Sequence, residues 1–156
     1  MEKDKNFLTI YGKVLRYLAI RPRSLKEITD YLQKRVKVKQ IIKEKIINQL
    51  DAEGLIDDEN FAHWWLDQRA AFRPKGSLAL TAELRQKGIE RSVIEKILSK
   101  SLNEAGLAEA ALTKKLKAYR RLPPPEFRQK ALAFLQRRGF SWETAKSVVD
   151  ELSQKR

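Results

Sequence analysis

The sequence predicts an all-α protein made of three tandem three-helix repeats. Apolar residues recur at helical spacing along the chain, and no segment alternates convincingly at the two-residue period of a β-strand. A short motif recurs three times: a leucine is followed by basic residues and then by a predicted turn. Its copies start at Leu32, Leu84 and Leu135. The stretch 50–55 also returns almost unchanged as 102–107. Repetition at a fixed period indicates one supersecondary unit used several times.

We expect the repeats to occupy residues 1–54, 55–106 and 107–156, stacked as an elongated, curved array. The second and third helices of each repeat resemble a helix-turn-helix in outline, because a short turn joins them. Many helical bundles contain the same pair, so this outline alone is weak support for DNA binding.

The first repeat begins with an apolar stripe over 8–19 that stops near Pro22, since proline does not continue a helix. Ser24 then opens the second helix in a capping-box pattern. The third helix carries apolar residues over 41–50, and we expect Gly54 to end it.

The second and third repeats follow the same plan. A helix from about Asp58 breaks at 73–76, where a proline and a glycine fall together. A helix over about 104–121 opens the third repeat, and the prolines at 123–125 replace the earlier break.

The turn between the second and third helices needs a left-handed backbone in many helix-turn-helix connections. Gly88 and Gly139 supply it without a Cβ clash. The first repeat lacks this glycine and reads Arg-Val-Lys-Val-Lys over 35–39, so its turn is expected to differ. Repeat equivalence also predicts that Gly106, like Gly54, ends a helix.

The composition excludes most catalytic and metal chemistry. Without cysteine there is no thiolate nucleophile and no cysteine metal site. The single histidine, His63, has no histidine partner for zinc and lies outside any nucleophilic triad pattern. The pair Asp57 and Asp58 fits a helix N-cap better than a divalent-ion site. We expect no enzyme activity, no metal and no cofactor.

Hydropathy gives no sign of a membrane protein. No apolar run approaches the roughly 18 residues that span a bilayer. The first six residues also lack the apolar segment of a signal peptide. We expect a cytoplasmic monomer.

The net charge of +13 is unevenly distributed. Residues 13–49 and 114–138 each carry a net charge of +8, whereas residues 50–68 carry −6. Basic blocks of this kind attract polyanions such as nucleic acid, with an affinity that falls as salt rises. A merely solubilising surface is the alternative. The acidic segment indicates that one face meets something other than phosphate.

Basic side chains at helix breaks and turns are the strongest candidates for partner contacts. Spacings of three and four place Lys114, Lys117 and Arg121 on one predicted helical face. Trp65 is expected in the core, and Trp64 is a candidate for an exposed contact. The candidate partner-binding residues are Arg73, Lys75, Lys87, Lys114, Lys115, Lys117, Arg120, Arg121, Arg137 and Arg138.

Four passages together resemble a known family, the RecX regulatory proteins. The most specific is Gly-Leu-Ile-Asp-Asp-Glu-Asn-Phe-Ala at 54–62. The others are the helix over 75–89, the lysine-rich helix over 111–117, and Phe-Leu-Gln-Arg-Arg-Gly-Phe at 134–140. They occur in the family's order and cover most of residues 15–152.

The resemblance implies a regulator of RecA recombinase in DNA repair and homologous recombination. RecX-like proteins lie in the groove of the RecA–DNA filament and inhibit its strand exchange, ATP hydrolysis and coprotease activity. The expected partner is therefore the RecA filament, with weak, sequence-indifferent DNA contact. A stand-alone helix-turn-helix DNA-binding regulator is the alternative, and it would prefer one duplex sequence.

Overall fold

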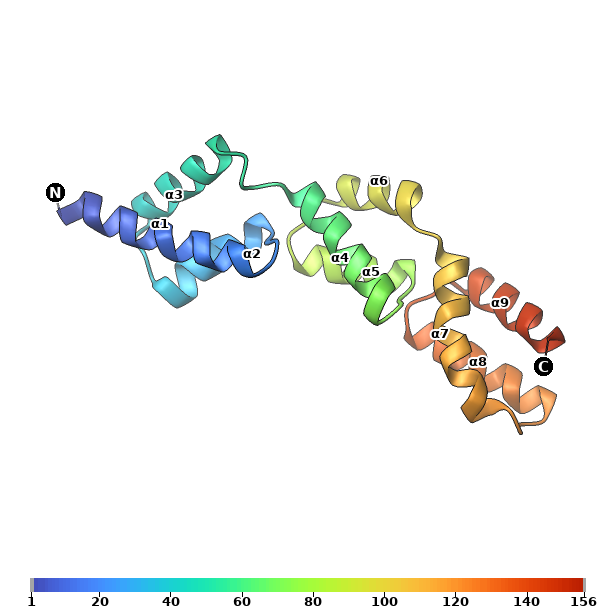
Figure 1. Cartoon of the computed structure of the whole chain (residues 1–156). Coiled ribbons are helices and arrows are strands. Elements are labelled where there is room, and N and C mark those ends of the chain that lie inside the picture. Colours follow the sequence, from blue (N-terminus) through green and yellow to red (C-terminus); the bar gives the residue numbers. More distant parts are fainter. Residues whose placement is uncertain (1, 156) are drawn as a thin grey trace.

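The computed structural model describes residues 2–155, and the side chains of residues 6–155 (Figure 1). Over these residues the chain forms α-helices and one π-helical segment, with no β-strand. The predicted all-α repeat fold is confirmed. The elements are α1 (Glu2–Ile20), α2 (Leu25–Asp30), η1 (Tyr31–Val36), α3 (Gln40–Ala52), α4 (Asp58–Phe72), α5 (Ser77–Gln86), α6 (Arg91–Ser101), α7 (Glu104–Tyr119), α8 (Pro124–Arg137) and α9 (Trp142–Gln154).

The helices form three trios, α1–α3, α4–α6 and α7–α9, which follow one another along an elongated molecule (Figure 1). The accessible surface is 10230 Å². A compact monomer of 18.2 kDa would expose about 8,100 Å². The excess of surface arises because the trios are arranged in a row rather than around one centre.

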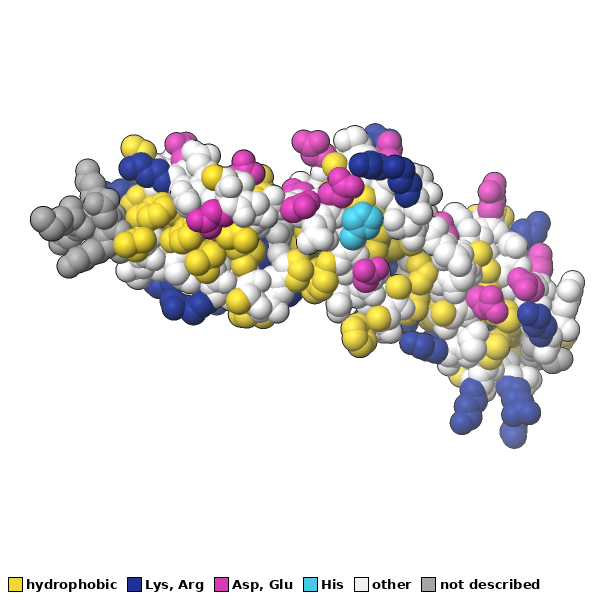
Figure 2. Space-filling model, turned by 45° about the horizontal axis from the view of Figure 1, so that its top comes forward, with side chains coloured by type: hydrophobic (Ala, Val, Ile, Leu, Met, Phe, Trp, Pro, Cys, Tyr) yellow, Lys and Arg dark blue, Asp and Glu magenta, His cyan; other side chains and the backbone are white. Residues whose placement is uncertain are grey.

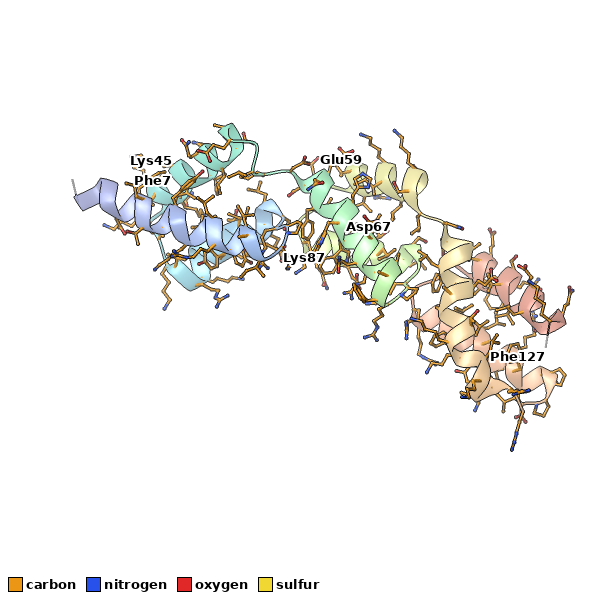
Figure 3. The ribbon with its side chains drawn as sticks, viewed as in Figure 1. Phe7, Lys45, Glu59, Asp67, Lys87 and Phe127 are labelled. Atoms are coloured by element: carbon orange, nitrogen blue, oxygen red, sulfur yellow. The ribbon has the colours of Figure 1, made fainter. Side chains whose placement is uncertain are left out.

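Each trio has its own hydrophobic core. Val14, Ile28 and Leu50 are fully buried in the first trio. In the second, the same role falls to a cluster centred on Phe61 and Leu84, and in the third to one centred on Phe127, seen in Figure 3. Separate cores explain why the sequence repeats, because each unit must bury its own apolar stripe.

Local signals set several helix starts as expected. The Ser24 side chain accepts a hydrogen bond from the backbone N–H of Glu27, which completes the predicted capping box. Asp57 accepts from the backbone N–H of Asn60 and so caps α4, which agrees with the predicted cap.

The expectation that Gly106 ends a helix is wrong. α6 already ends at Ser101, and Gly106 lies in the first turn of α7. Its N–H donates to the side-chain oxygen of Asn103, which is the N-cap. Gly54, in contrast, has a φ of +70° beyond the end of α3. The two similar phrases therefore have different structures: Asp51 lies inside α3, whereas Asn103 lies between two helices and caps α7.

The first-repeat turn has an unusual solution. The helix after α2 widens into the π-helical segment η1, which ends at Lys37 with a φ of +59°. Lys37 is the one residue other than glycine with positive φ among residues 2–155. It lies 51 residues before Gly88, which in turn lies 51 residues before Gly139. All three turns therefore use a left-handed residue at the same place in the repeat.

Neighbouring trios meet along two equivalent contacts, which we call the repeat seams. At the second seam, the N–H groups of Gly76 and Leu78 donate to the carbonyls of Arg138 and Gly139, at 2.9 and 3.0 Å. These donors are at the start of α5, where helix N–H groups lack partners within the helix. A Cβ on Gly76 would lie 2.3 Å from the Phe140 Cα, so only glycine fits.

The first seam repeats this arrangement with other groups. The Lys26 ammonium donates to the Gln86 carbonyl at 2.9 Å, and Gly88 packs against the Lys26 side chain. The Asp58 carboxylate accepts from the backbone N–H of Leu25 at 2.8 Å and thereby satisfies the start of α2. Burial raises the pKa of Asp58 despite this hydrogen bond, and the charges of Asp57 and Glu90 add to the increase.

Trp64 also belongs to this seam, so its predicted exposure is wrong. Its ring packs against the core of the second trio, and the Arg21 guanidinium lies 5.2 Å from the ring centroid. Trp65 packs against the same core, as expected, and its indole N–H donates to Glu83 at 2.7 Å.

Candidate partner-binding surface

The second seam carries a basic cleft with a volume of about 400 Å³. We call it the seam cleft. Its cationic lining comes from three elements: the residue after α4, the middle of α7, and the residue after α8. Among the side chains that the structure describes, none that lines the cleft is a carboxylate. The lining residues are Phe72, Arg73, Pro74, Ala111, Lys114, Lys115, Phe134 and Arg138.

Four of the predicted partner-binding residues therefore come together here, although they lie up to 65 positions apart in the chain. Arg73 follows α4, where Pro74 prevents the helix from continuing. Lys114 and Lys115 are exposed on α7. Arg138 is the C-cap of α8, and its guanidinium lies 3.4 Å from the Pro74 carbonyl.

Aromatic rings position the cations. The Phe134 ring lies between two of them, with the Lys115 ammonium 5.5 Å and the Arg138 guanidinium 5.0 Å from its centroid. Phe72 projects beside them and is 75% exposed. The cleft therefore has cations over the Phe134 ring and an exposed Phe72 ring at its edge. Such a cleft suits a ligand that has both negative charge and apolar or planar groups.

The charges of the cleft are not neutralised within it. Burial lowers the pKa of Arg138 from its ordinary value, and the nearby charge of Arg73 lowers it further. Arginine remains charged at neutral pH even so. The two guanidiniums repel each other, and this repulsion would be relieved by an anion bound between them.

Two of the predicted contacts lie instead in internal ion pairs. Lys75 pairs with the Glu83 carboxylate, which also accepts from Arg69 at 2.9 Å. Lys87 pairs with Glu27 at 3.3 Å across the first seam. Each lysine shares its carboxylate with an arginine, since Glu83 also pairs with Arg69 and Glu27 also pairs with Arg21. Both lysines are held by contacts within the array, so they stabilise it more readily than they bind a partner.

The remaining predicted contacts lie near the end of the third trio. Lys117 is exposed on α7, and Arg137 is exposed at the last position of α8. α7 ends at Tyr119, two residues earlier than expected, so Arg120 and Arg121 belong to the turn that follows. The helical-face argument therefore holds for Lys114 and Lys117 but not for Arg121.

The aromatic part of the cleft is absent from the sequence prediction. Phe72 precedes the predicted Arg73, and Phe134 belongs to the predicted 134–140 phrase, but neither was proposed as a contact. An apolar residue at the end of a helix, directly before a basic residue and a proline, is the signal that could have indicated Phe72.

Acidic side chains occupy a different part of the surface. Figure 2 shows a face on which acidic groups gather around His63, over the second trio and its junction with the first. Glu59 and Asp67 of α4 belong to this group and are exposed (Figure 3). The molecule therefore presents an acidic face in addition to the basic cleft.

Among the side chains of residues 6–155, no group of three or more acidic or histidine side chains is placed to hold a metal ion. Within residues 2–155, no helix has the length and apolarity needed to cross a membrane.

Comparison with known proteins identifies the family. Residues 57–98 match the model described as the second three-helix domain of RecX, and residues 104–149 match the one described as the third. Regulatory protein RecX of Chlorobium phaeobacteroides is 34% identical over 142 residues, which cover 91% of this chain and 92% of that protein. The chain belongs to the RecX family.

Other RecX relatives are longer. Regulatory protein RecX of Bacillus subtilis is 32% identical over 144 residues, but the match covers 54% of that protein. The chain thus spans about half of the Bacillus protein and nearly all of the Chlorobium one. The family assignment makes this chain a regulatory protein of the RecX type.

Solved RecX structures have the same fold. The crystal structure of RecX from Lactobacillus salivarius has a TM-score of 0.83 at 23% identity and covers 97% of this chain. A second crystal structure, of regulatory protein RecX, has a TM-score of 0.78 at 27% identity and covers 92% of this chain and 71% of its own. The similarity extends along the array, so the row of trios is common to these structures.

Proposed function

We propose that this chain binds the RecA–DNA filament and inhibits its ATP hydrolysis, strand exchange and coprotease activity. The seam cleft is the observation that carries the proposal, because it gathers Arg73, Lys114, Lys115 and Arg138 beside the exposed Phe72, with no carboxylate among the described lining residues. Membership of the RecX family supports RecA as the partner.

The elongated form supports a filament as the partner. Three trios in a row provide a long surface, and the seam cleft lies where two rigid units are hydrogen-bonded to each other. In the proposed mechanism, the cleft receives acidic side chains or DNA phosphates of one filament subunit while the other trios reach its neighbour. Charge-assisted hydrogen bonds to arginine fix the orientation of such groups.

The test is a titration of RecA ATPase on single-stranded DNA. The double variant Lys114→Glu/Lys115→Glu reverses two cleft charges on an exposed helix face and leaves the core untouched. We expect it to weaken inhibition by roughly a hundredfold, since close charge pairs are worth about 1.5 kcal/mol or more each. The matched control Lys100→Glu/Lys146→Glu makes the same change in net charge on α6 and α9, away from the cleft.

Full inhibition by a folded Lys114→Glu/Lys115→Glu protein would show that the seam cleft does not bind the filament. Equal loss in both variants would indicate that net charge alone matters. Circular dichroism establishes that each variant is folded.

A titration with DNA but without RecA tests the alternative function, a stand-alone DNA-binding regulator. That alternative needs a positive recognition helix, yet the exposed face of α9 includes Glu143 and Glu151. On α6, Arg91 pairs with Glu95 and Lys96 with Glu59. We expect weak DNA binding without sequence preference, and tight binding to one duplex at physiological salt would contradict the proposal.

A further inference from the structure

A second concave surface lies in the first trio, between α1 and α3. It is a groove of about 960 Å³, which we call the lysine-rimmed groove. Its apolar floor is formed by Phe7, Ile10, Val36, Val38 and Ile42. Figure 3 labels Phe7 of α1 and Lys45 of α3, which lie on its two sides. In Figure 2, hydrophobic side chains gather over this part of the first trio.

The groove lies beside a core position that all three trios fill with an aliphatic side chain. Ile46 lies 51 residues before Ile97, which in turn lies 51 residues before Val148, the same spacing that relates Lys37, Gly88 and Gly139. Ile46, Ile97 and Val148 are 0%, 1% and 4% exposed. Lys45 is the exposed neighbour of Ile46 and belongs to the rim of the groove.

The first trio differs from the others in an exposed apolar side chain. Ile41, which lines the groove, is 65% exposed. The equivalent residues in the other two trios are Ser92 and Glu143, which are polar and exposed. The groove therefore offers apolar surface at a position where the other trios are polar.

The rim of the groove is strongly basic. Lys13, Lys37, Lys39 and Lys45 line it, and none of its lining residues between 6 and 155 is a carboxylate. An occupant must therefore supply apolar side chains for the floor and negative charge for the rim.

We propose that the lysine-rimmed groove binds an acidic amphipathic helix of a partner protein. Aliphatic side chains of that helix would pack on the apolar floor and against Ile41. Its carboxylates would meet the lysines. The α1 side of the groove spans 6–13, about two helical turns, which matches the contact length of a short helix.

The shape of the groove favours a helix over an anionic membrane. Ile10 is 5% exposed and lies on the floor between two helices, where a bilayer surface does not reach. Membrane-binding helices instead present a convex apolar face that enters the lipid.

A second copy of this chain fits less well. Its most acidic segment is 50–68, and in α4 the apolar residues Phe61 and Leu66 are already buried in their own core. That segment therefore has no free apolar face to offer.

The test uses a designed peptide and involves neither RecA nor DNA, so its result is independent of the proposed function. The probe is a fluorescein-labelled helix of about 14 residues with leucine at helical spacing and glutamate elsewhere. A scrambled peptide of equal composition is the peptide control. We expect saturable binding of the probe, and at least about tenfold weaker binding of the scrambled peptide.

Two groove variants sharpen the test. Lys45→Glu should weaken binding at least about tenfold through charge repulsion, while Lys146→Glu, on the exposed side of α9, should not. Ile41→Ser, which gives this exposed position the residue that the second trio has there, should also weaken binding at least about tenfold, and its thermal midpoint should stay unchanged because Ile41 is exposed. Loss of binding in a protein of unchanged stability cannot be attributed to unfolding.

Each other outcome overturns the proposal. Equal binding of the scrambled peptide would show a merely electrostatic surface. Failure of the probe to bind would exclude the helix. Groove-dependent binding to phosphatidylglycerol vesicles, without binding to the peptide, would assign the groove to a membrane. Dimerisation in sedimentation that Lys45→Glu abolishes would assign it to a second copy.

Discussion

At the scale of single residues, Lys37 shows that backbone geometry is more strictly repeated than sequence. Its φ of +59° matches the role of Gly88 and Gly139, whose φ values are +79° and +84°. A residue with a Cβ is disfavoured there by about 1–2 kcal/mol. In the first trio Lys37 has this conformation even so, and the π-helical segment η1 directly precedes it.

We expect Lys37→Gly to stabilise the protein by about 0.5–1 kcal/mol. The left-handed strain is relieved, but glycine adds freedom to the unfolded chain. Urea unfolding measures the change. Lys37→Ala, which removes the charge and keeps the Cβ, is the control and should give no gain. A gain of equal size in both variants would show that charge, not backbone strain, is responsible.

At Gly76, in contrast to Lys37, adding a Cβ is expected to destabilise the protein. A Cβ there would lie 2.3 Å from the Phe140 Cα and 2.4 Å from the Gly139 carbonyl oxygen. We expect Gly76→Ala to destabilise the protein by about 1–3 kcal/mol, because the second seam must shift to admit the methyl group.

The matched control for this substitution is Gly12→Ala, since Gly12 lies in α1 with nothing within 4 Å of an added Cβ. That change should stabilise the helix by about 0.5–1 kcal/mol. Thermal unfolding of both variants gives the comparison, and equal effects would refute the steric account of the seam.

At the scale of elements, two half-buried carboxylates connect helices through charge. Burial raises the pKa of Glu27, but hydrogen bonds from Arg21 and from the Ser24 backbone, with the charges of Arg21 and Lys87, outweigh it and lower the pKa. Burial likewise raises the pKa of Glu83, and hydrogen bonds from Lys75, Trp65 and Arg69 lower it to a net decrease.

These shifts predict a loss of stability in acid. A lowered folded-state pKa adds stability that is fully present above the unfolded value of about 4.5 and lost as pH falls through the folded value. Asp58, with a raised pKa, acts in the opposite direction. We expect the urea concentration at the unfolding midpoint to decrease as the pH is lowered below 4.5, and to decrease less in Glu27→Gln/Glu83→Gln. An equal decrease in that variant would contradict the assignment.

Most elements follow from local sequence, and the exceptions have a common cause. Ser24 and Asp57 act as the caps their spacing predicts, and proline ends helices at Pro22 and Pro74. The role of Gly106 is not predictable from the phrase it shares with Gly54, because Asn103 competes to start α7.

The seam cleft is only partly predictable for the same kind of reason. Local patterns indicate that Arg73, Lys114 and Arg138 are basic and exposed, but not that α5 packs on the turn after α8 and brings them together. Lys75 and Lys87 are equally basic in sequence, yet they form ion pairs with Glu83 and Glu27 inside the array.

At the scale of the whole molecule, three separate cores predict uneven stability. The lysine-rimmed groove leaves the first trio with less apolar burial between α1 and α3 than the third has between α7 and α9. Units of a linear array open with different free energies when their cores differ.

We therefore expect amide hydrogen exchange to be fastest in the first trio, next in the second, and slowest in the third around Phe127. Mass spectrometry of exchanged peptides measures this order. Uniform protection across the three trios would show a single cooperative unit instead.

The repeat seams also determine how a signal could travel through the molecule. The first and third trios lie at opposite ends, with the second between them (Figure 1). The path from the lysine-rimmed groove to the seam cleft crosses both repeat seams, at Asp58 and at Gly76. Any coupling between the two sites would be reciprocal, so a ligand at one would change the affinity at the other by the same factor.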